Sequence, residues 1–340
     1  MLLTIAVPTF NRLECLRLLV TSVSGQLAQL NAQGVRIELL ICDNASSDGT
    51  AGYLEGLAPR EDLRVIRHAS NEGADMNMVH CFRQARGRYL WICGDDDLPV
   101  PGALGLVVDC IEREKPGLVY LPASWHDGDL SPFLTHRPEP GVFFPIGAAA
   151  LSHRANAYIT FISSWVVDRE AYAGCAGAPD PARYAGTSLV QLEWHLALLI
   201  SGRKLMTTER RWVMARSGNA GGYSLFDVFI TNFTRIIDDK LHAHVALRRF
   251  FRDFMLRSYL PGLVWGLRRH TVGAFGKLDH DKLEAKLLSS WPGDRLLRTQ
   301  LSLIGRLPLS LARVTFVLGW LFARLWLSWL GLSIRTGDRA

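Results

Sequence analysis

Short apolar runs alternate with longer amphipathic segments through the first 121 residues. The apolar runs resemble strands buried in a sheet, and they cover residues 4–7, 37–42, 63–67, 89–93 and 118–121. The segments between them repeat apolar residues at helical spacing, and Asn11 and Asp48 stand where side chains cap the first two helices. This alternation predicts an α/β fold with a mostly parallel sheet flanked by helices.

The pattern is less regular in the second third of the chain. Prolines and glycines interrupt residues 122–186, where only Tyr158–Val167 resembles a strand. A helix is expected over Leu189–Ser201, ended by Gly202, and a strand over Arg210–Arg216. Helices dominate from Phe226. We therefore expect a first domain over 1–225, with halves 1–121 and 122–225, and a helical region over 226–340.

Polar side chains gather where three of the predicted strands end. Pro8-Thr9-Phe10-Asn11 follows the first strand, Asp43-Asn44 the second, and Asp95-Asp96-Asp97 the fourth. Ligands of open α/β sheets bind at the carboxyl ends of the strands. These clusters therefore predict a ligand site along one edge of the sheet.

The three adjacent carboxylates repel one another, and a divalent cation would relieve that repulsion. Mg²⁺ prefers hard oxygen ligands and is commonly held by one or two carboxylates with substrate phosphates. The alternative is a solvated acidic turn that caps the next helix.

The glycine motifs that bind phosphate through backbone amides are missing from the sequence. No Gly-x-Gly-x-x-Gly follows the first strand, and no Gly-x-x-x-x-Gly-Lys-Ser/Thr occurs. These absences argue against a dinucleotide-dependent oxidoreductase and a P-loop enzyme. A site with carboxylates but no glycine cradle is expected to handle phosphates through a metal.

Charge is distributed unevenly along the chain. The net charge is +6, yet residues 235–340 hold 18 Lys and Arg against 8 Asp and Glu. Basic segments of this kind bind nucleic acid or anionic membranes. The six cysteines show no paired or metal-type spacing, which favours a reducing compartment. The apolar start lacks the basic region of a signal peptide and is expected to stay in the cytoplasm.

Five motifs in order resemble those of family 2 glycosyltransferases of the bacterial cell-surface polysaccharide type. They are Ile5–Arg12, Leu40–Thr50, Asn71–Gly73 with Asn77, Ala85–Tyr89, and Gly94–Asp97 with Pro101–Leu104. The resemblance implies the GT-A fold, a nucleoside-diphosphate sugar donor, and a Mg²⁺ or Mn²⁺ cofactor. It also implies transfer of a glycosyl group, inverting in most members of the family.

The resemblance also implies roles for individual residues. Asp43 would contact the base, Asp95 would lie near the ribose, and Asp96 would bind the metal. A literal Asp-x-Asp alignment instead uses Asp95 and Asp97, so all three aspartates stay candidate ligands. Arg216, with Asn219, would reach the diphosphate from a loop that orders over the donor; the alternative is a plain connecting loop. The expected nucleotide-sugar site comprises Pro8, Thr9, Asn11, Asp43, Asn44, Asn71, Asn77, Asp95 and Arg216.

The chain departs from the family at the catalytic base. The Glu-Asp pair that precedes a glycine in the family falls here on Val190 and Gln191, and glutamine cannot accept a proton. Glu193 is the nearest carboxylate, but it is turned by about 200° on a helix. Glu193 and Gln191 are the candidate catalytic residues, and the alternative for Glu193 is an ordinary surface carboxylate.

Residues 309–335 form a strongly apolar segment in which Arg313, Arg324 and Arg335 recur along one line of a helix. A helix lying in the membrane interface fits this pattern best. A helix packed in a domain or dimer and a spanning helix are the alternatives.

A membrane surface suggests an acceptor that is itself membrane-bound, and no aromatic–basic motif for nucleic acid is present. The expected function is transfer of a sugar to a polyprenyl-diphosphate-linked saccharide at the inner face of a bacterial membrane. The protein would be peripheral there, in O-antigen, capsule or related glycan synthesis. The alternatives are a soluble or protein acceptor, and a catalytically weak protein that binds nucleotide sugar as an assembly partner.

Overall fold

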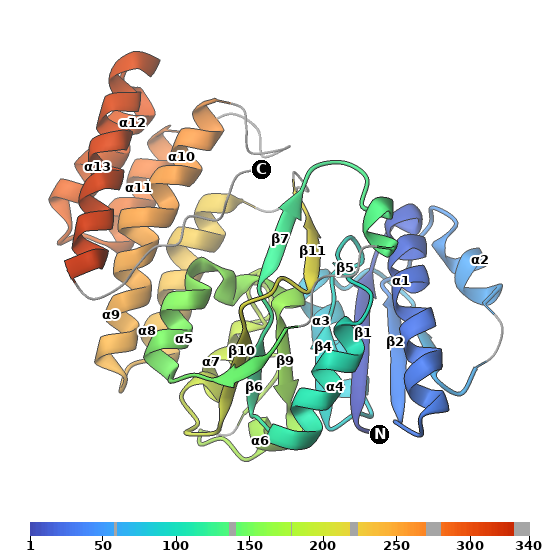
Figure 1. Ribbon diagram of the computed structural model, residues 1–340. Helices are drawn as coiled ribbons and strands as arrows, with labels where there is room; N and C mark the ends of the chain where they lie inside the picture. The colour runs from blue at the N-terminus through green and yellow to red at the C-terminus, as the bar shows by residue number, and fades with distance from the viewer. Residues whose placement is uncertain (58–59, 136–140, 178, 218–223, 270–279, 330–340) are drawn as a thin grey trace. The chain divides into compact units, whose positions relative to one another are not determined.

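The computed structural model describes residues 1–57, 60–135, 141–177, 179–217, 224–269 and 280–329 (Figure 1). The chain divides into two compact units, Met1–Ser217 and Gly218–Ala340. Each unit is described separately below.

The first unit is built on an eight-stranded sheet with the order β3-β2-β1-β4-β9-β6-β10-β8 (Figure 1). The strands are β1 (Leu3–Thr9), β2 (Ile37–Asp43), β3 (Leu63–Arg67), β4 (Tyr89–Ile92), β6 (Leu118–Tyr120), β8 (Phe143–Pro145), β9 (Trp165–Asp168) and β10 (Leu205–Thr208). Strands β1 to β4 are parallel, as are β6 and β10, while β9 and β8 run antiparallel to their neighbours. The predicted mostly parallel α/β sheet is therefore confirmed.

Helices cover both faces of this sheet because successive strand residues point to opposite sides. Leu3, Ile5 and Val7 of β1 join a core formed with α1 (Leu13–Ala32) and α4 (Ala103–Glu114). The helix α3 (Ala74–Gln84) packs against β1, β2 and β4 outside that core cluster. The remaining helices are α2 (Thr50–Glu55), α5 (Ala148–Ala155), α6 (Arg169–Ala173) and α7 (Leu192–Leu199), with 3-10 turns η1 (Ser131–Leu134), η2 (Asn156–Thr160) and η3 (Ile162–Ser164).

A small second sheet has the order β5-β11-β7. Its strands are β5 (Leu98–Pro99), β11 (Val213–Arg216) and β7 (Ala123–His126). Because β5 begins directly after Asp97, this sheet carries β11 and β7 to the end of β4.

Two local predictions are wrong. The predicted strand over 158–167 consists mainly of 3-10 turns, since the backbone N–H groups of Phe161 and Ser164 donate to the Tyr158 and Phe161 carbonyls instead of a sheet ladder; only β9 pairs. Asn11 does not cap the first helix, because Arg12 takes the N-cap position and the Leu13 N–H donates to Asp48 Oδ2, 3.0 Å away.

The second unit is helical where it is described. Its α-helices are α8 (Phe233–Lys240), α9 (Val245–Phe254), α10 (Leu260–Arg268), α11 (His280–Ser290), α12 (Arg295–Arg306) and α13 (Leu309–Trp329), and two π-helical segments are η4 (Asp227–Asn232) and η5 (Met255–Tyr259).

The helix α13 packs on α10 and α12, with Phe316 stacked on Trp265 at 5.5 Å between ring centroids. Away from those helices it exposes Leu311, Val314, Val317, Leu318, Leu321, Phe322 and Leu325. Arg313 is also exposed, whereas the side chain of Arg324 and all of Arg335 lie outside the described residues. Within the described ranges, no helix combines the length and apolar character needed to cross a membrane.

Candidate functional site

The carboxyl ends of β1, β2 and β4 lie side by side at one edge of the sheet. Thr9 and Asp43 are partners in the parallel register of β1 and β2. Thr9 Oγ1 donates to Asp95 Oδ2 at 2.8 Å, which joins the end of β1 to the residues after β4. The structure therefore brings together polar clusters that are far apart in the sequence.

Arg12 lies between two of the three aspartates. Its Nη1 is 3.2 Å from Asp95 Oδ1 and 3.0 Å from Asp96 Oδ2. Burial raises the pKa of Asp95 to about 6, against the opposing effect of Arg12. Burial and the nearby Asp96 raise the pKa of Asp97 well above its usual range. The local positive charge therefore does not fully stabilise three ionised carboxylates, and this oxygen-rich set fits a hard divalent cation such as Mg²⁺ or Mn²⁺.

Asp97 is held by contacts on both of its carboxylate oxygens. Ser163 Oγ donates to Oδ2, and the Arg216 backbone N–H donates to Oδ1 at 3.3 Å. Ser163 Oγ also accepts the Gly94 N–H at 2.8 Å. A Cβ on Gly94 would lie 3.0 Å from carboxylate oxygens of Asp96 and Asp97, so only glycine leaves this packing undisturbed.

The Asp96 side chain is more exposed than that of Asp95, at 14% against 6%. A ligand arriving from solvent therefore meets Asp96 before Asp95. This is compatible with Asp96 as the favoured metal ligand, a role that stays a prediction.

Asp43 offers a buried acceptor at the same edge. Its Oδ1 accepts the Ser46 N–H at 3.0 Å, while Oδ2 has no hydrogen-bond partner in the described part of the chain. The Arg67 Nε lies 3.6 Å from Oδ2. A buried carboxylate oxygen without a donor loses the hydrogen bonds it would make to water, and an N–H of a bound ligand would restore one.

The predicted asparagines mostly fasten the loops around this edge. Asn11 Oδ1 accepts the Ser47 N–H at 2.7 Å, which ties the loop after β1 to the loop after β2. Asn44 Nδ2 donates to Asn71 Oδ1 at 2.7 Å. Asn77 is buried and donates to the Cys42 carbonyl at 3.0 Å. Their predicted contacts with a nucleotide remain predictions, as does that of the half-buried Pro8.

Arg216 ends β11 beside the aspartates. Besides its backbone contact with Asp97, its Nη1 donates to the Gly128 carbonyl at 2.5 Å. Asn219, the other residue expected to reach the diphosphate, lies outside the described residues.

The two candidate catalytic residues lie in the core around α7. Glu193 is fully buried and accepts a hydrogen bond from the Tyr172 hydroxyl at 3.2 Å. Gln191 is also buried, and its Nε2 donates to the Thr160 carbonyl. An acceptor could reach Glu193 only after neighbouring side chains move, so its catalytic role stays a prediction with no geometric support.

Sequence reasoning missed Arg12 and Ser163. Arg12 could have been found from the sequence, because it is a cation that follows the polar run at the end of the first strand. No sequence pattern indicates Ser163, since its contact with Asp97 spans 66 positions and depends on the turn η3.

Comparison with known proteins finds a family model that matches most of the first unit. Residues 4–167 match the model of glycosyl transferase family 2. Abequosyltransferase RfbV of Salmonella typhimurium is 33% identical over 116 residues, which are 34% of this chain and 34% of that protein. The putative glycosyltransferase EpsE of Bacillus subtilis is 27% identical over 158 residues, 43% of this chain and 55% of EpsE. The matches thus span between a third and somewhat over half of these relatives.

Solved structures resemble the chain over nearly its whole length. The structure of S. aureus TarS 1–349 in complex with UDP has a TM-score of 0.60 at 14% identity, covering 99% of this chain and 94% of that one. The mannosyltransferase PcManGT from Pyrobaculum calidifontis, in complex with GDP-Man and Mn²⁺, has a TM-score of 0.51 at 14% identity, covering 95% and 87%. At these identities the likeness establishes the GT-A fold alone. The match to the glycosyl transferase family 2 model covers residues 4–167, which contain the ordered motifs of the sheet edge.

Proposed function

We propose that this protein transfers a sugar from a nucleoside-diphosphate donor to a saccharide acceptor in the synthesis of a cell-surface glycan. The observation that carries the proposal is the pairing of two features at one sheet edge. Asp43 presents a buried carboxylate oxygen without a hydrogen-bond donor, and Asp95–Asp97 form a carboxylate cluster whose negative charge a further cation would stabilise. A nucleoside diphosphate satisfies both, since its base supplies an N–H and its phosphates bind a divalent cation.

The residues at this sheet edge would have different roles in binding and activating the donor. Asp96 and Asp97 would hold a Mg²⁺ or Mn²⁺ ion, which supplies Lewis-acid stabilisation of the diphosphate leaving group. Arg12 holds Asp95 and Asp96 in place, and the Arg216 backbone N–H donates to Asp97. Asp43 would select bases that carry an N–H. TarS and PcManGT are described in complexes with UDP and with GDP-Man and Mn²⁺, which supports a donor of this class.

An exposed aromatic surface supports a saccharide as the acceptor. Trp125 and Tyr158 are 43% and 41% exposed and stack with ring centroids 5.9 Å apart. Phe161 lies 4.8 Å from Trp125 between centroids. Trp125 pairs with Ala215, which precedes Arg216, and Phe161 precedes Ser163 by two residues, so the aromatic surface adjoins the contacts that hold Asp97. Aromatic faces exposed beside a polar site suit sugar rings.

The acceptor is proposed to be polyprenyl-diphosphate-linked, with the protein peripheral on the cytoplasmic membrane face. The support comes from α13, which exposes a leucine-rich face in a strongly basic unit. A helix with these properties lies in the interface of an anionic membrane.

A second candidate is nucleotide-sugar binding with little or no turnover. It is favoured by the burial of Glu193, the one carboxylate within the described helix α7. The two candidate functions differ in whether the protein supplies a proton acceptor for the incoming hydroxyl.

Calorimetric titration with UDP, GDP and dTDP, each with and without Mn²⁺, tests the donor site. One nucleotide is expected to bind in a Mn²⁺-dependent manner, and Asp43→Ala is expected to weaken it at least about tenfold, since a hydrogen bond to a charged group is lost. Absence of binding by any nucleoside diphosphate would reject the proposal. Mass spectrometry of reactions with lipid-linked and soluble saccharides then separates transfer from binding alone.

Two further variants test the acceptor side and the membrane. Trp125→Ala is expected to raise KM for the saccharide and leave KM for the donor unchanged, with Trp125→Phe as the conservative control. Flotation with anionic vesicles is expected to fail for Leu318→Asp and for a chain ending before Leu309, but not for Leu296→Asp on α12, which replaces a leucine 78% exposed. If the shortened chain still bound to the vesicles, the proposed role of α13 in membrane binding would be wrong.

A further inference from the structure

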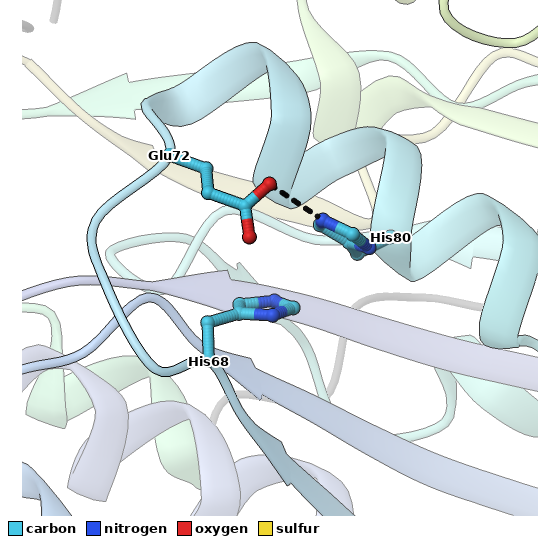
Figure 2. A group of neighbouring side chains, drawn as sticks. All are labelled: His68, Glu72 and His80. Carbon is cyan, nitrogen blue, oxygen red and sulfur yellow. Dashed lines mark hydrogen bonds and ion pairs between the residues drawn. The ribbon is translucent and has the colours of Figure 1, made fainter.

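A second cluster of potential metal ligands lies at the end of β3, apart from the three aspartates. His68 follows β3, Glu72 lies in the loop before α3, and His80 is on α3 (Figure 2). One ligand atom from each side chain lies within 4.8 Å of the other two. Figure 2 shows the two imidazole rings over one another with the Glu72 carboxylate beside them.

The distances already approach those of a bound metal. His80 Nε2 is 3.2 Å from Glu72 Oε2. Two ligands of a tetrahedral zinc ion with bonds near 2.0–2.1 Å are separated by about 3.3 Å. The two rings have centroids 4.3 Å apart at an angle of 38°. Since the ligand atoms lie within 4.8 Å of one another, a movement of the His68 ring nitrogen by at most about 1.5 Å brings it to the same separation.

A second observation points to a missing partner at His68. Its Nε2 is buried and has no hydrogen-bond partner in the described part of the chain. Buried polar atoms of this kind normally have one. The side chains of His80 and Glu72 are 25% and 41% exposed, so an ion can enter from solvent.

Backbone hydrogen bonds hold the cluster in place, and the nearby cation Arg67 pairs with carboxylates outside it. The His68 backbone N–H donates to the Asp43 carbonyl at 2.9 Å, and the Glu72 N–H donates to Asn44 Oδ1 at 3.0 Å. Arg67 pairs with Asp43 at 3.6 Å and Glu55 at 3.7 Å, so carboxylates outside the cluster engage this neighbouring cation. Three ligands within 13 residues, on an anchored loop and the helix that follows it, lose little conformational freedom when they bind an ion.

From this geometry we propose that His68, Glu72 and His80 bind a transition-metal ion of the zinc class, at a site separate from the aspartates. Two imidazoles and one carboxylate suit Zn²⁺ and Co²⁺, whereas Mg²⁺ prefers oxygen ligands. Water completes the coordination. The ion links the end of β3 to α3 and fixes the loop that contains Asn71, which contacts Asn44 beside Asp43. The proposal does not depend on the proposed transfer reaction.

Loading of the metal-free full chain with Co²⁺ tests the site, because four-coordinate Co²⁺ absorbs visible light and Zn²⁺ displaces it. One Co²⁺ per chain is expected at this site. His68→Ala and His80→Ala are expected to abolish the signal, and Glu72→Gln to weaken affinity at least about tenfold. His242→Ala, which removes an exposed histidine of the second unit, and Asp96→Asn are expected to keep it.

Circular dichroism verifies that each variant is folded, and the intact chain gives an independent readout. Zn²⁺ is expected to raise the Tm of the unaltered protein and to slow hydrogen exchange over residues 69–73. A cobalt signal that survives His80→Ala but disappears in Asp96→Asn would assign the ion to the aspartates and overturn the proposal. The proposal would also be overturned if the protein took up no Co²⁺ and Zn²⁺ did not change its Tm. The contact between Glu72 and His80 would then be a hydrogen bond only.

Discussion

The aspartate cluster and Glu193 are both buried carboxylates, yet their surroundings differ. Asp95 and Asp96 share the cationic Arg12, and backbone or hydroxyl donors hold Asp97. Glu193 lies on a helix whose residues are all buried, with Tyr172 as a hydroxyl donor. The first arrangement concentrates negative charge at the end of a strand, where a ligand can use it. The second places one carboxylate inside apolar packing, away from solvent.

This comparison shows that burial alone does not identify a functional carboxylate. What separates the two is the neighbouring charge and the position at a strand end or inside a helix.

Asp96→Asn is expected to lower glycosyl transfer by about a thousandfold, because it removes the most accessible carboxylate proposed to hold the cation. Turnover of the best donor found by calorimetry, measured against Mn²⁺ concentration, provides the test. Glu170→Gln removes a carboxylate that is 72% exposed and serves as the matched control. Full activity of Asp96→Asn would exclude Asp96 as a ligand.

His195→Gln is expected to make the protein less sensitive to acid. Burial lowers the pKa of His195 to about 3, so the folded state resists protonation. The stability linked to His195 is therefore complete above its unfolded pKa of about 6.5 and is lost as the pH falls below that value. Between pH 7.5 and 5, wild type should lose about 2 kcal/mol more unfolding free energy than His195→Gln.

Urea unfolding at the two pH values measures this difference. The raised pKa of Asp95 acts in the opposite direction in both proteins, so it cancels in the comparison. Equal acid sensitivity of the two proteins would mean that His195 does not resist protonation.

Ser163→Ala is expected to lower the free energy of unfolding by about 1.5 kcal/mol. The Gly94 N–H and Asp97 Oδ2 each lose a hydrogen bond in a buried position. Urea unfolding with and without Mn²⁺ checks this, with Ser217→Ala as an exposed control that also removes a serine contact to a carboxylate. A change below about 0.3 kcal/mol would show that the serine is dispensable.

Glu193→Gln is expected to change stability by about 1 kcal/mol and turnover by less than about threefold, because the amide oxygen can still accept from Tyr172. Steady-state kinetics and urea unfolding on the same preparation separate the two effects. A hundredfold loss of turnover in a folded protein would instead establish Glu193 as the base and remove the distinction drawn above.

The parallel strands and the polar edge were predictable from the sequence because buried apolar runs end abruptly in Asp43 and Asp95. The local sequence pattern is enough to predict the place of a residue that directly follows a buried strand. It was not enough for Ser163, whose role depends on a turn between distant segments. The burial of Glu193 had an available signal, since its neighbours Leu192, Trp194 and Leu196 make α7 apolar on all sides.

The hydrogen bond from the Arg216 backbone to Asp97 has a practical consequence for shortening the protein. Arg216 and Ser217 are the last residues of the first unit, and the Ser217 N–H donates to the His126 carbonyl at 2.9 Å. A first unit prepared alone must therefore extend to Ser217. Ending it before β11 would remove a strand from the small sheet and a donor from Asp97, and the loss would affect the carboxylate cluster as well as folding.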